Sequence, residues 1–338
     1  KSIKIYMLVK EKCVLVLLLV MISLVSAAQR TWTGSVDSDW ENSANWNGGT
    51  LPSNGDDVVI DGDDYTNAPS ISANSSFTID DLTIRDGAVL TKTGGSLTVS
   101  DDIVVNNATF TNSGGNLSAD RFTTSNSATA TLSGGTITLD NDLDLKSSST
   151  VNISTTVTKS GGGDDDINLG TGTSINISLG AYISGFNDVD FDGSGGVTFN
   201  LTGGTLDVTD DFKIQDGDNN SISVSGGILN VGDDFSIESD DNTISFSGSA
   251  DINIDDDLNF DGDDNALSSS GNATVDIAEE ITDDGSNASI NVGGNSSFNS
   301  DSIDDFSIVT QEPDVSGNVG SNVLPVEFLS FSSTVNEY

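Results

Sequence analysis

The stretch Asp80-Asp81-Leu82-Thr83-Ile84 has the pattern acid, acid, apolar, any, apolar, and this pattern returns along most of the chain. It is repeated as Asp101-Asp102-Ile103-Val104-Val105 and, near the end, as Asp304-Asp305-Phe306-Ser307-Ile308. The second acid defines a column whose members are 19 to 25 residues apart: Asp81, Asp102, Arg121, Asp142, Asp166, Asp188, Asp211, Asp234, Asp257, Glu280 and Asp305. A sequence repeat of this length is typical of a solenoid.

Each repeat contains three short segments in which apolar and polar residues alternate, as in Thr205–Val208, Phe212–Ile214 and Ser221–Val224. Alternation with a period of two predicts β-strands, and no clear helical period is found after residue 28. Paired glycines, such as those at 94–95 and 114–115, predict a corner with positive φ. Apolar rows are expected in the core, such as the row Phe212, Phe235, Leu258, Ile281 and Phe306. The fold class is therefore all-β, a parallel β-helix of about eleven coils over residues 77–308.

The two ends differ from the repeat. Residues 1–28 contain lysines, the apolar run 14–25 and Ser26-Ala27-Ala28, which predicts a signal peptide and a secreted or outer-surface location. The only cysteine, Cys13, lies in this segment. Residues 29–76 contain all three tryptophans and predict an N-terminal cap, which an open solenoid end requires. Residues 309–323 are predicted to be a linker, and residues 324–338 the start of a truncated C-terminal module.

Two stretches resemble parts of known secreted proteins. Thr31-Trp32-Thr33-Gly34, with Trp40, Asn45-Trp46, Pro52 and residues 56–60, resembles the opening of large secreted Bacteroidota β-helix proteins of pectin-lyase-like fold. Residues 324–331 resemble the start of a module that precedes a type IX secretion sorting domain. The resemblance implies a right-handed helix and this secretion route, and it implies little about activity.

Composition excludes several functions. The formal net charge of −42 argues against nucleic acid and anionic membranes as partners, because both attract basic proteins. We expect no membrane insertion once the signal is removed. The chain has no histidine and no cysteine after Cys13, which excludes histidine-dependent triads, thiolate nucleophiles and zinc sites with His or Cys ligands. Carboxylate chemistry and oxygen-ligated cations remain.

The double-acid column is the candidate site. Carboxylates stacked about 4.8 Å apart repel each other, so a bound cation would offset a destabilising term. Calcium suits such a site because it takes six to eight oxygen ligands. The proposed calcium ligands are Asp210, Asp211, Asp233, Asp234, Asp256, Asp257, Glu279 and Glu280. We expect nearby acids to contribute further ligands: Asp216, Asp218, Asp240, Asp241, Asp261, Asp263 and Asp264. The alternative is that each Asp only serves a turn before its strand, a role that Asn141 and Asn187 would fill equally well.

Three other patterns have competing interpretations. Residues 188–193 match half of an EF-hand loop, but Phe199 stands where the loop needs Glu, so we interpret this match as accidental. Arg121 is interpreted as an ion-pair partner of the stacked acids rather than as the base of a lyase. Outward rows of Thr, Ser and Asn, such as Thr109 and Thr111, could bind glycans or ice, although a solvated strand face explains them equally.

The sequence thus favours a secreted structural or adhesin-like β-solenoid that is stiffened by calcium and is not an enzyme. Its partners would be extracellular polysaccharide or a host or neighbouring cell surface. The alternative function is a carbohydrate-active enzyme, a polysaccharide lyase or glycoside hydrolase, on the same fold. Fold alone does not separate the two functions, because β-helices support both.

Overall fold

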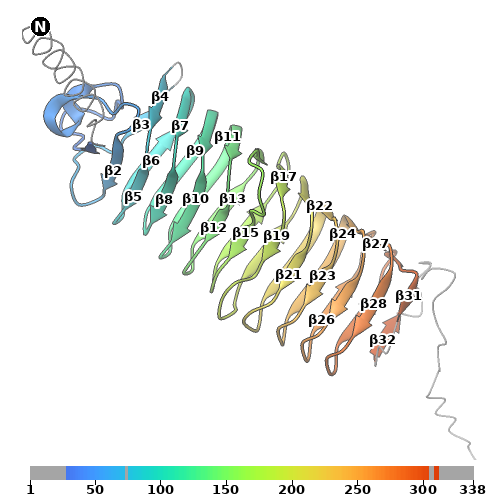
Figure 1. Ribbon diagram of the computed structural model, residues 1–338. Coiled ribbons are helices and arrows are strands. Elements are labelled where there is room, and N and C mark those ends of the chain that lie inside the picture. Colours follow the sequence, from blue (N-terminus) through green and yellow to red (C-terminus); the bar gives the residue numbers. More distant parts are fainter. Residues whose placement is uncertain (1–27, 73–74, 304–307, 312–338) are drawn as a thin grey trace, which may run out of the picture.

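The computed structural model describes residues 28–72, 75–303 and 308–311, which form a parallel β-solenoid of about ten turns (Figure 1). The prediction of an all-β parallel β-helix is confirmed, with about ten turns in place of eleven. Its right-handedness stays a prediction. At about 4.8 Å per turn the solenoid is roughly 50 Å long.

One wall of the solenoid, which we call wall 1, is a thirteen-stranded parallel sheet that begins after the acid column. Its strands are short because each coil turns a corner after a few residues. They are β1 (Gln29–Thr31), β2 (Asp57–Asp61), β5 (Leu82–Arg85), β8 (Asp102–Asn106), β10 (Arg121–Ser125), β12 (Leu143–Leu145), β15 (Ile167–Leu169), β18 (Val189–Asp190), β21 (Phe212–Ile214), β23 (Phe235–Ile237), β25 (Leu258–Phe260), β28 (Glu280–Asp283) and β31 (Ser302–Ile303).

The other two walls belong to one continuous sheet that bends at the glycine corner. Wall 2 contains β3 (Ser70–Ile71), β6 (Val89–Lys92), β13 (Thr150–Ile153), β16 (Ser174–Ile177), β19 (Thr198–Leu201), β26 (Ala266–Ser269), β29 (Ser289–Val292) and β32 (Ile308–Gln311). Wall 3 contains β4 (Ser76–Ile79), β7 (Ser96–Val99), β14 (Thr156–Lys159), β17 (Tyr182–Phe186), β20 (Thr205–Val208), β27 (Thr274–Ile277) and β30 (Ser297–Asn299). Four long strands cross the corner and contribute to both walls: β9 (Thr109–Ala119), β11 (Thr129–Leu139), β22 (Ser221–Val231) and β24 (Thr243–Ile254).

The glycine corner is as tight as the sequence predicts. Gly115 and Gly135 have φ of +73° and +79°. A Cβ at Gly135 would lie 1.7 Å from the carbonyl oxygen of Gly115 on the preceding coil. A side chain is therefore excluded both by the backbone conformation and by the coil beneath it.

The core is a set of apolar rows that follow the strand register. Phe212, Phe235, Leu258 and Ile281 occupy equivalent positions of wall 1 and are completely buried. The rings of Phe212 and Phe235 stack with centroids 4.6 Å apart. This row was predicted to continue to Phe306, but β28 pairs Ile281 with Ile303. The continuation to Phe306 was therefore wrong.

A buried asparagine ladder lies at the corner between walls 1 and 2, and sequence reasoning missed it. The backbone N–H of Asn220 donates to Oδ1 of Asn242 at 3.0 Å, and the N–H of Asn242 donates to Oδ1 of Asn265 at 2.9 Å. All three residues are at most 1% exposed. The side chains thereby satisfy amides that a buried turn would otherwise leave unpaired.

The N-terminal end is closed by a tryptophan cluster, as predicted. Trp32, Trp40 and Trp46 are buried, and the ring centroids of Trp40 and Trp46 are 4.6 Å apart. Two short 3-10 helices, η1 (Ser43–Asn45) and η2 (Asn47–Gly49), place Trp46 between them. Figure 1 shows this cap at one end of the solenoid, so the apolar core is not open there.

The boundaries at the other end differ slightly from the prediction. The last described strand, β32, pairs with β29 as far as Gln311, so the coil pattern continues past residue 308. Residues 1–27 of the predicted signal peptide (residues 1–28), most of the linker and the C-terminal module lie outside the described residues.

Candidate functional site

The acid column lies at the corner where the chain enters wall 1. Backbone pairing aligns Val189, Phe212, Phe235, Leu258 and Ile281 in successive coils, so the acids that precede them are stacked. The predicted last member, Asp305, is wrong, because the residue that pairs with Glu280 is Ser302. Asp305 itself lies outside the described residues. The stack follows from the repeat because equal coil lengths bring equivalent residues to the same corner.

The second acids form a hydrogen-bonded ladder along the solenoid axis. From Asp211 to Glu280 the backbone N–H of each second acid donates to Oδ1 of the second acid on the preceding coil. The N–H to Oδ1 distances are 2.9 Å for Asp211 to Asp188, 2.9 Å for Asp234 to Asp211, 3.0 Å for Asp257 to Asp234 and 2.8 Å for Glu280 to Asp257. These bonds support the turn interpretation, but they use only one oxygen of each carboxylate. The second oxygen can still bind a cation.

The structure brings seven of the eight predicted ligands into three groups, each with carboxylate oxygens within 4.8 Å of one another. The groups are Asp188/Asp210/Asp211, Asp233/Asp234/Asp256 and Asp256/Asp257/Glu279. Glu280 is not in any of them, and its Oε1 accepts a hydrogen bond from Ser302 Oγ at 3.0 Å. The last two groups share Asp256, so they form one continuous band of carboxylates.

The first of these groups already contains a cation from the protein. Lys213 Nζ lies 2.8 Å from Oδ2 of Asp188 and 2.7 Å from Oδ2 of Asp211. These contacts raise the pKa of Lys213, although its partial burial acts in the opposite direction. Lys213 therefore occupies the position between two coils that a bound cation would take.

The band Asp233–Glu279 has no such partner among the lysines and arginines that the structure describes. At the position of Lys213, the next coils have Ser236 and Asn259. Partial burial, and the charge of Asp233 next to it, raise the pKa of Asp234. A hydrogen bond with Asp256 raises the pKa of Asp233. Burial and the neighbouring acids thus both disfavour the ionised form of these carboxyl groups.

Arg121 is an ion-pair partner, as predicted. Its Nε lies 3.2 Å from Oδ2 of Asp142, and its Nη1 lies 3.8 Å from Oδ2 of Asp102 on the other side. Oδ2 of Asp144 is 3.9 Å from Nε, and it also accepts from Lys146 Nζ at 2.8 Å. Carboxylates surround the guanidinium and raise its pKa, which excludes a role as a base at neutral pH.

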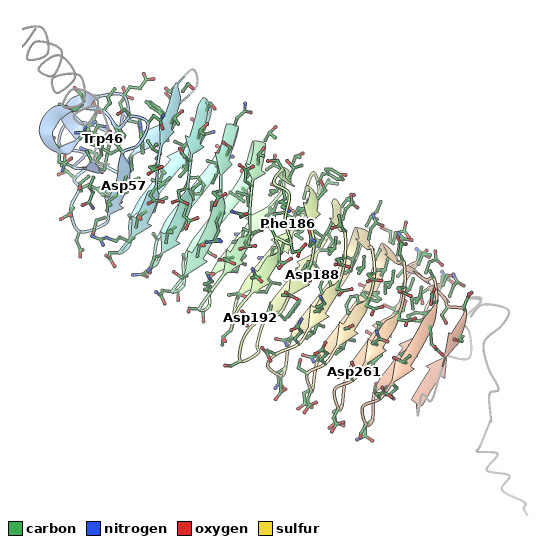
Figure 2. The ribbon with its side chains drawn as sticks, viewed as in Figure 1. Trp46, Asp57, Phe186, Asp188, Asp192 and Asp261 are labelled. Atoms are coloured by element: carbon green, nitrogen blue, oxygen red, sulfur yellow. The ribbon has the colours of Figure 1, made fainter. Side chains whose placement is uncertain are left out.

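Sequence reasoning missed a further group, Asp166, Asp188 and Asp190. Burial, with the charges of Asp188 and Asp166, raises the pKa of Asp190 to about 6. The prediction that the EF-hand match at residues 188–193 is accidental is confirmed. The segment contains the wall 1 strand β18, and the side chains of Val189 and Phe191 are completely buried. Asp188 and Asp190 share a face because they are two residues apart on a strand, a signal that was available in the sequence. Figure 2 labels Asp188 and Asp192 of this segment.

The additional acids that were expected to help the column do not lie beside it. They follow the wall 1 strands, at the opposite end from the column. Asp218, Asp240 and Asp263 form a ladder of their own there, in which the N–H of Asp240 donates to Asp218 Oδ1 at 3.2 Å and the N–H of Asp263 to Asp240 Oδ1 at 2.7 Å. The expectation was wrong because a β-strand separates residues that are close in sequence.

Comparison with known proteins adds little about function. Residues 31–134, which include the cap and the first coils, match the family described as "Domain of unknown function (DUF8693)". Neither the curated proteins nor the solved structures contain a match. In the described part of the chain, no helix is both long and apolar enough to cross a membrane.

Proposed function

We propose that this chain is a secreted or cell-surface structural rod of adhesin type, and that calcium binds along the band Asp233–Glu279. The observation that carries the proposal is the band Asp233/Asp234/Asp256/Asp257/Glu279, in which two groups of three carboxylates share one member and have no ion pair with a described lysine or arginine. Export is supported by the pattern of residues 1–28. The type IX route is supported only by the resemblance of residues 324–331.

Calcium suits the band for two chemical reasons. Each group offers three carboxylates, and backbone carbonyls or water complete a calcium shell of six to eight oxygens. The ladder hydrogen bonds hold one oxygen of each second acid, so these carboxylates are oriented before the ion arrives. A divalent ion also removes the repulsion between neighbouring coils, which acts along the axis of the solenoid.

The structural role is supported by the regularity of the coils. Between β2 and β31 nearly every coil adds the same three strands and the same type of core row, which makes a stiff extended body. A rod of this kind presents long flat walls rather than one deep site. This architecture suits attachment to, or spacing from, an extended surface.

One observation favours the alternative, a carbohydrate-active enzyme. Asp190, with its pKa of about 6, lies beside Asp188 and Asp166, and pairs of carboxylates with unequal pKa values hydrolyse glycosides. Incubation with neutral and acidic polysaccharides tests this function. New chain ends that disappear in Asp190→Asn would support the enzyme and contradict a purely structural role.

Thermal unfolding by circular dichroism, in calcium and in chelator, tests the calcium proposal. Saturation at about a hundred times Kd stabilises a protein by about 2.7 kcal/mol, so we expect the melting temperature to rise by roughly 5–10 °C. The double variant Asp234→Asn/Asp257→Asn keeps the ladder oxygens and should lose this rise. Asp240→Asn, in the other ladder, is the matched control and should keep it. An equal rise in sodium chloride of the same ionic strength, or in the double variant, would contradict the proposal.

A further inference from the structure

A shallow hollow of about 360 Å³ lies on wall 3, away from the acidic band. It is lined by Ser96, Asn116, Leu117, Ser118, Thr136 and Thr138, and we call it the hydroxyl hollow. The lining comes from β7, β9 and β11, which lie side by side (Figure 1). The strand register explains the lining, because Ser96, Asn116 and Thr136 form one outward column. Thr98, Ser118 and Thr138 form the next one.

The polar side chains of the hollow have hydrogen-bonding capacity that the protein does not use. Among the described residues, none bonds to the side chain of Ser96, Asn116, Ser118, Thr136 or Thr138. Outward asparagines elsewhere differ, since Asn176 Nδ2 donates to Asn152 Oδ1 at 3.0 Å and Asn200 Nδ2 to Asn176 Oδ1 at 2.9 Å. The hollow thus presents hydroxyl and amide groups whose partners are water, and a ligand hydroxyl can replace that water.

The hollow is also uncharged, in a chain with a formal charge of −42. Outward residues of the two columns remain uncharged from Ser76 on β4 to Thr158 on β14. Farther along wall 3, the same columns acquire Asp207, Asp251 and Asp276. The uncharged area is therefore limited to the coils around the hollow.

We propose that the hydroxyl hollow binds a neutral polysaccharide. A ligand without charge but with many hydroxyls matches a surface that has the same properties. The volume lies near the lower end of small-molecule sites, ~300–1,000 Å³, so it suits a few sugar units of a longer chain. The overall negative charge of the protein disfavours acidic polysaccharides. Ice requires a flat array, which the hollow interrupts.

The ligand would be bound and not cleaved at this place. No carboxylate lines the hollow, whereas glycoside hydrolysis needs two. The inference rests on the adhesive part of the proposed function and identifies its ligand class. Polysaccharide binding in the hollow does not depend on calcium, so this inference and the calcium proposal can fail separately.

Retention of the full chain on insoluble cellulose, xylan and mannan, in calcium, is the direct test, with polygalacturonate as the acidic comparison. We expect depletion from solution by at least one neutral polysaccharide and none by polygalacturonate. Thr138→Asp should weaken retention roughly tenfold, because a carboxylate must lose water beside a neutral sugar. Thr205→Asp, on the same wall but outside the hollow, should bind like the unmodified chain. Circular dichroism establishes that each variant is folded.

A second variant, Ser118→Leu, fills the hollow without adding charge and should also weaken retention. Failure of all neutral polysaccharides to retain the protein would overturn the inference, as would equal retention of Thr138→Asp and Thr205→Asp. Incorporation into growing ice without any retention on polysaccharide would assign the surface to ice instead. A calcium-dependent rise in melting temperature together with no retention would support the calcium-binding rod and overturn only the inference that the hollow binds a polysaccharide.

Discussion

The coils near Arg121 and Lys213 differ from the coils between Asp233 and Glu279 in how the negative charge of the stacked acids is compensated. Around Arg121 and Lys146 the carboxylates of Asp102, Asp142 and Asp144 are paired with cations of the protein. Around Asp234 and Asp257 no described lysine or arginine is close, and the carboxylates face one another. The strands and the core rows are otherwise alike, but the ladder of acids is interrupted at Arg121, which has no carboxylate to accept the N–H of Asp142. In some coils a protein side chain therefore compensates the charge of the acids, and in the band Asp233–Glu279 the proposed calcium would take that role.

The largest expected effect is that of pH without calcium. Asp190, Asp234 and Asp166 have pKa values raised mainly by burial in the folded state. Between the ordinary value near 3.8 and the raised value, about 6 for Asp190, the folded state binds more protons than the unfolded state. Stability is then fully present below this window and is lost as pH rises through it. In chelator, a change from pH 7 to about pH 5 should raise the melting temperature by several degrees.

Calcium should reverse the sign of this dependence, because its ligands must be deprotonated. The rise in melting temperature that calcium produces at pH 7 should therefore shrink at pH 5. A melting temperature that falls steadily from pH 7 to pH 5 in chelator would show that ionisation of these acids does not destabilise the folded state.

Removal of the internal cation should have the next largest effect. Lys213→Met keeps the length of the side chain but leaves Asp188 and Asp211 without their shared partner. We expect a loss of about 1–3 kcal/mol in chelator, since the hydrogen bonds involve charged groups, measured by urea unfolding. Calcium should restore part of this loss, because the group Asp188/Asp210/Asp211 becomes free to bind it.

Lys146→Met is the matched control for Lys213. Lys146 is 55% exposed at its side chain, and its only ion pair with a described residue is with Asp144, which keeps Arg121 as a second partner. The expected loss is at most ~1 kcal/mol, without a gain from calcium. If Lys213→Met and Lys146→Met behave alike in calcium, then Lys213 does not occupy an ion position.

The repeat and its core could be predicted from sequence because both depend on local patterns. Alternation places Phe212 and Ile214 inside, equal coil lengths stack them, and paired glycines such as Gly134-Gly135 define the corner. The last coil was misplaced because the acid pair at 304–305 matches the phrase better than Asp301-Ser302 does. In the structure the register of the last coil is set by Ile303, which pairs with Ile281, and not by the acid pair.

Other features depend on contacts between coils and leave a weaker trace in the sequence. The alternation of β6 places the side chain of Lys92 inside the solenoid, although a lysine side chain is expected on the surface. It is completely buried, its Nζ donates to the carbonyl of Gly114 at 2.6 Å, and burial lowers its pKa to about 8. The asparagine ladder was missed because asparagine is ordinary in turns. The acids that form the groups were predicted from the sequence, but only the strand register shows that Lys213 neutralises one group.

The smallest expected effect tests whether a side chain and an ion are interchangeable. Asn259 occupies in β25 the position of Lys213 in β21, two coils later, next to Asp257 and Asp234. Asn259→Lys should place an ammonium between these carboxylates and stabilise the protein in chelator by about 0.5–1 kcal/mol. It should also reduce the calcium-dependent rise in melting temperature, because the ammonium competes with the ion for the same oxygens. Asn259→Gln is the neutral control for the hydrogen bond that Thr282 Oγ1 now donates to Asn259. An unchanged calcium response in Asn259→Lys would place any bound calcium elsewhere than the band Asp233–Glu279.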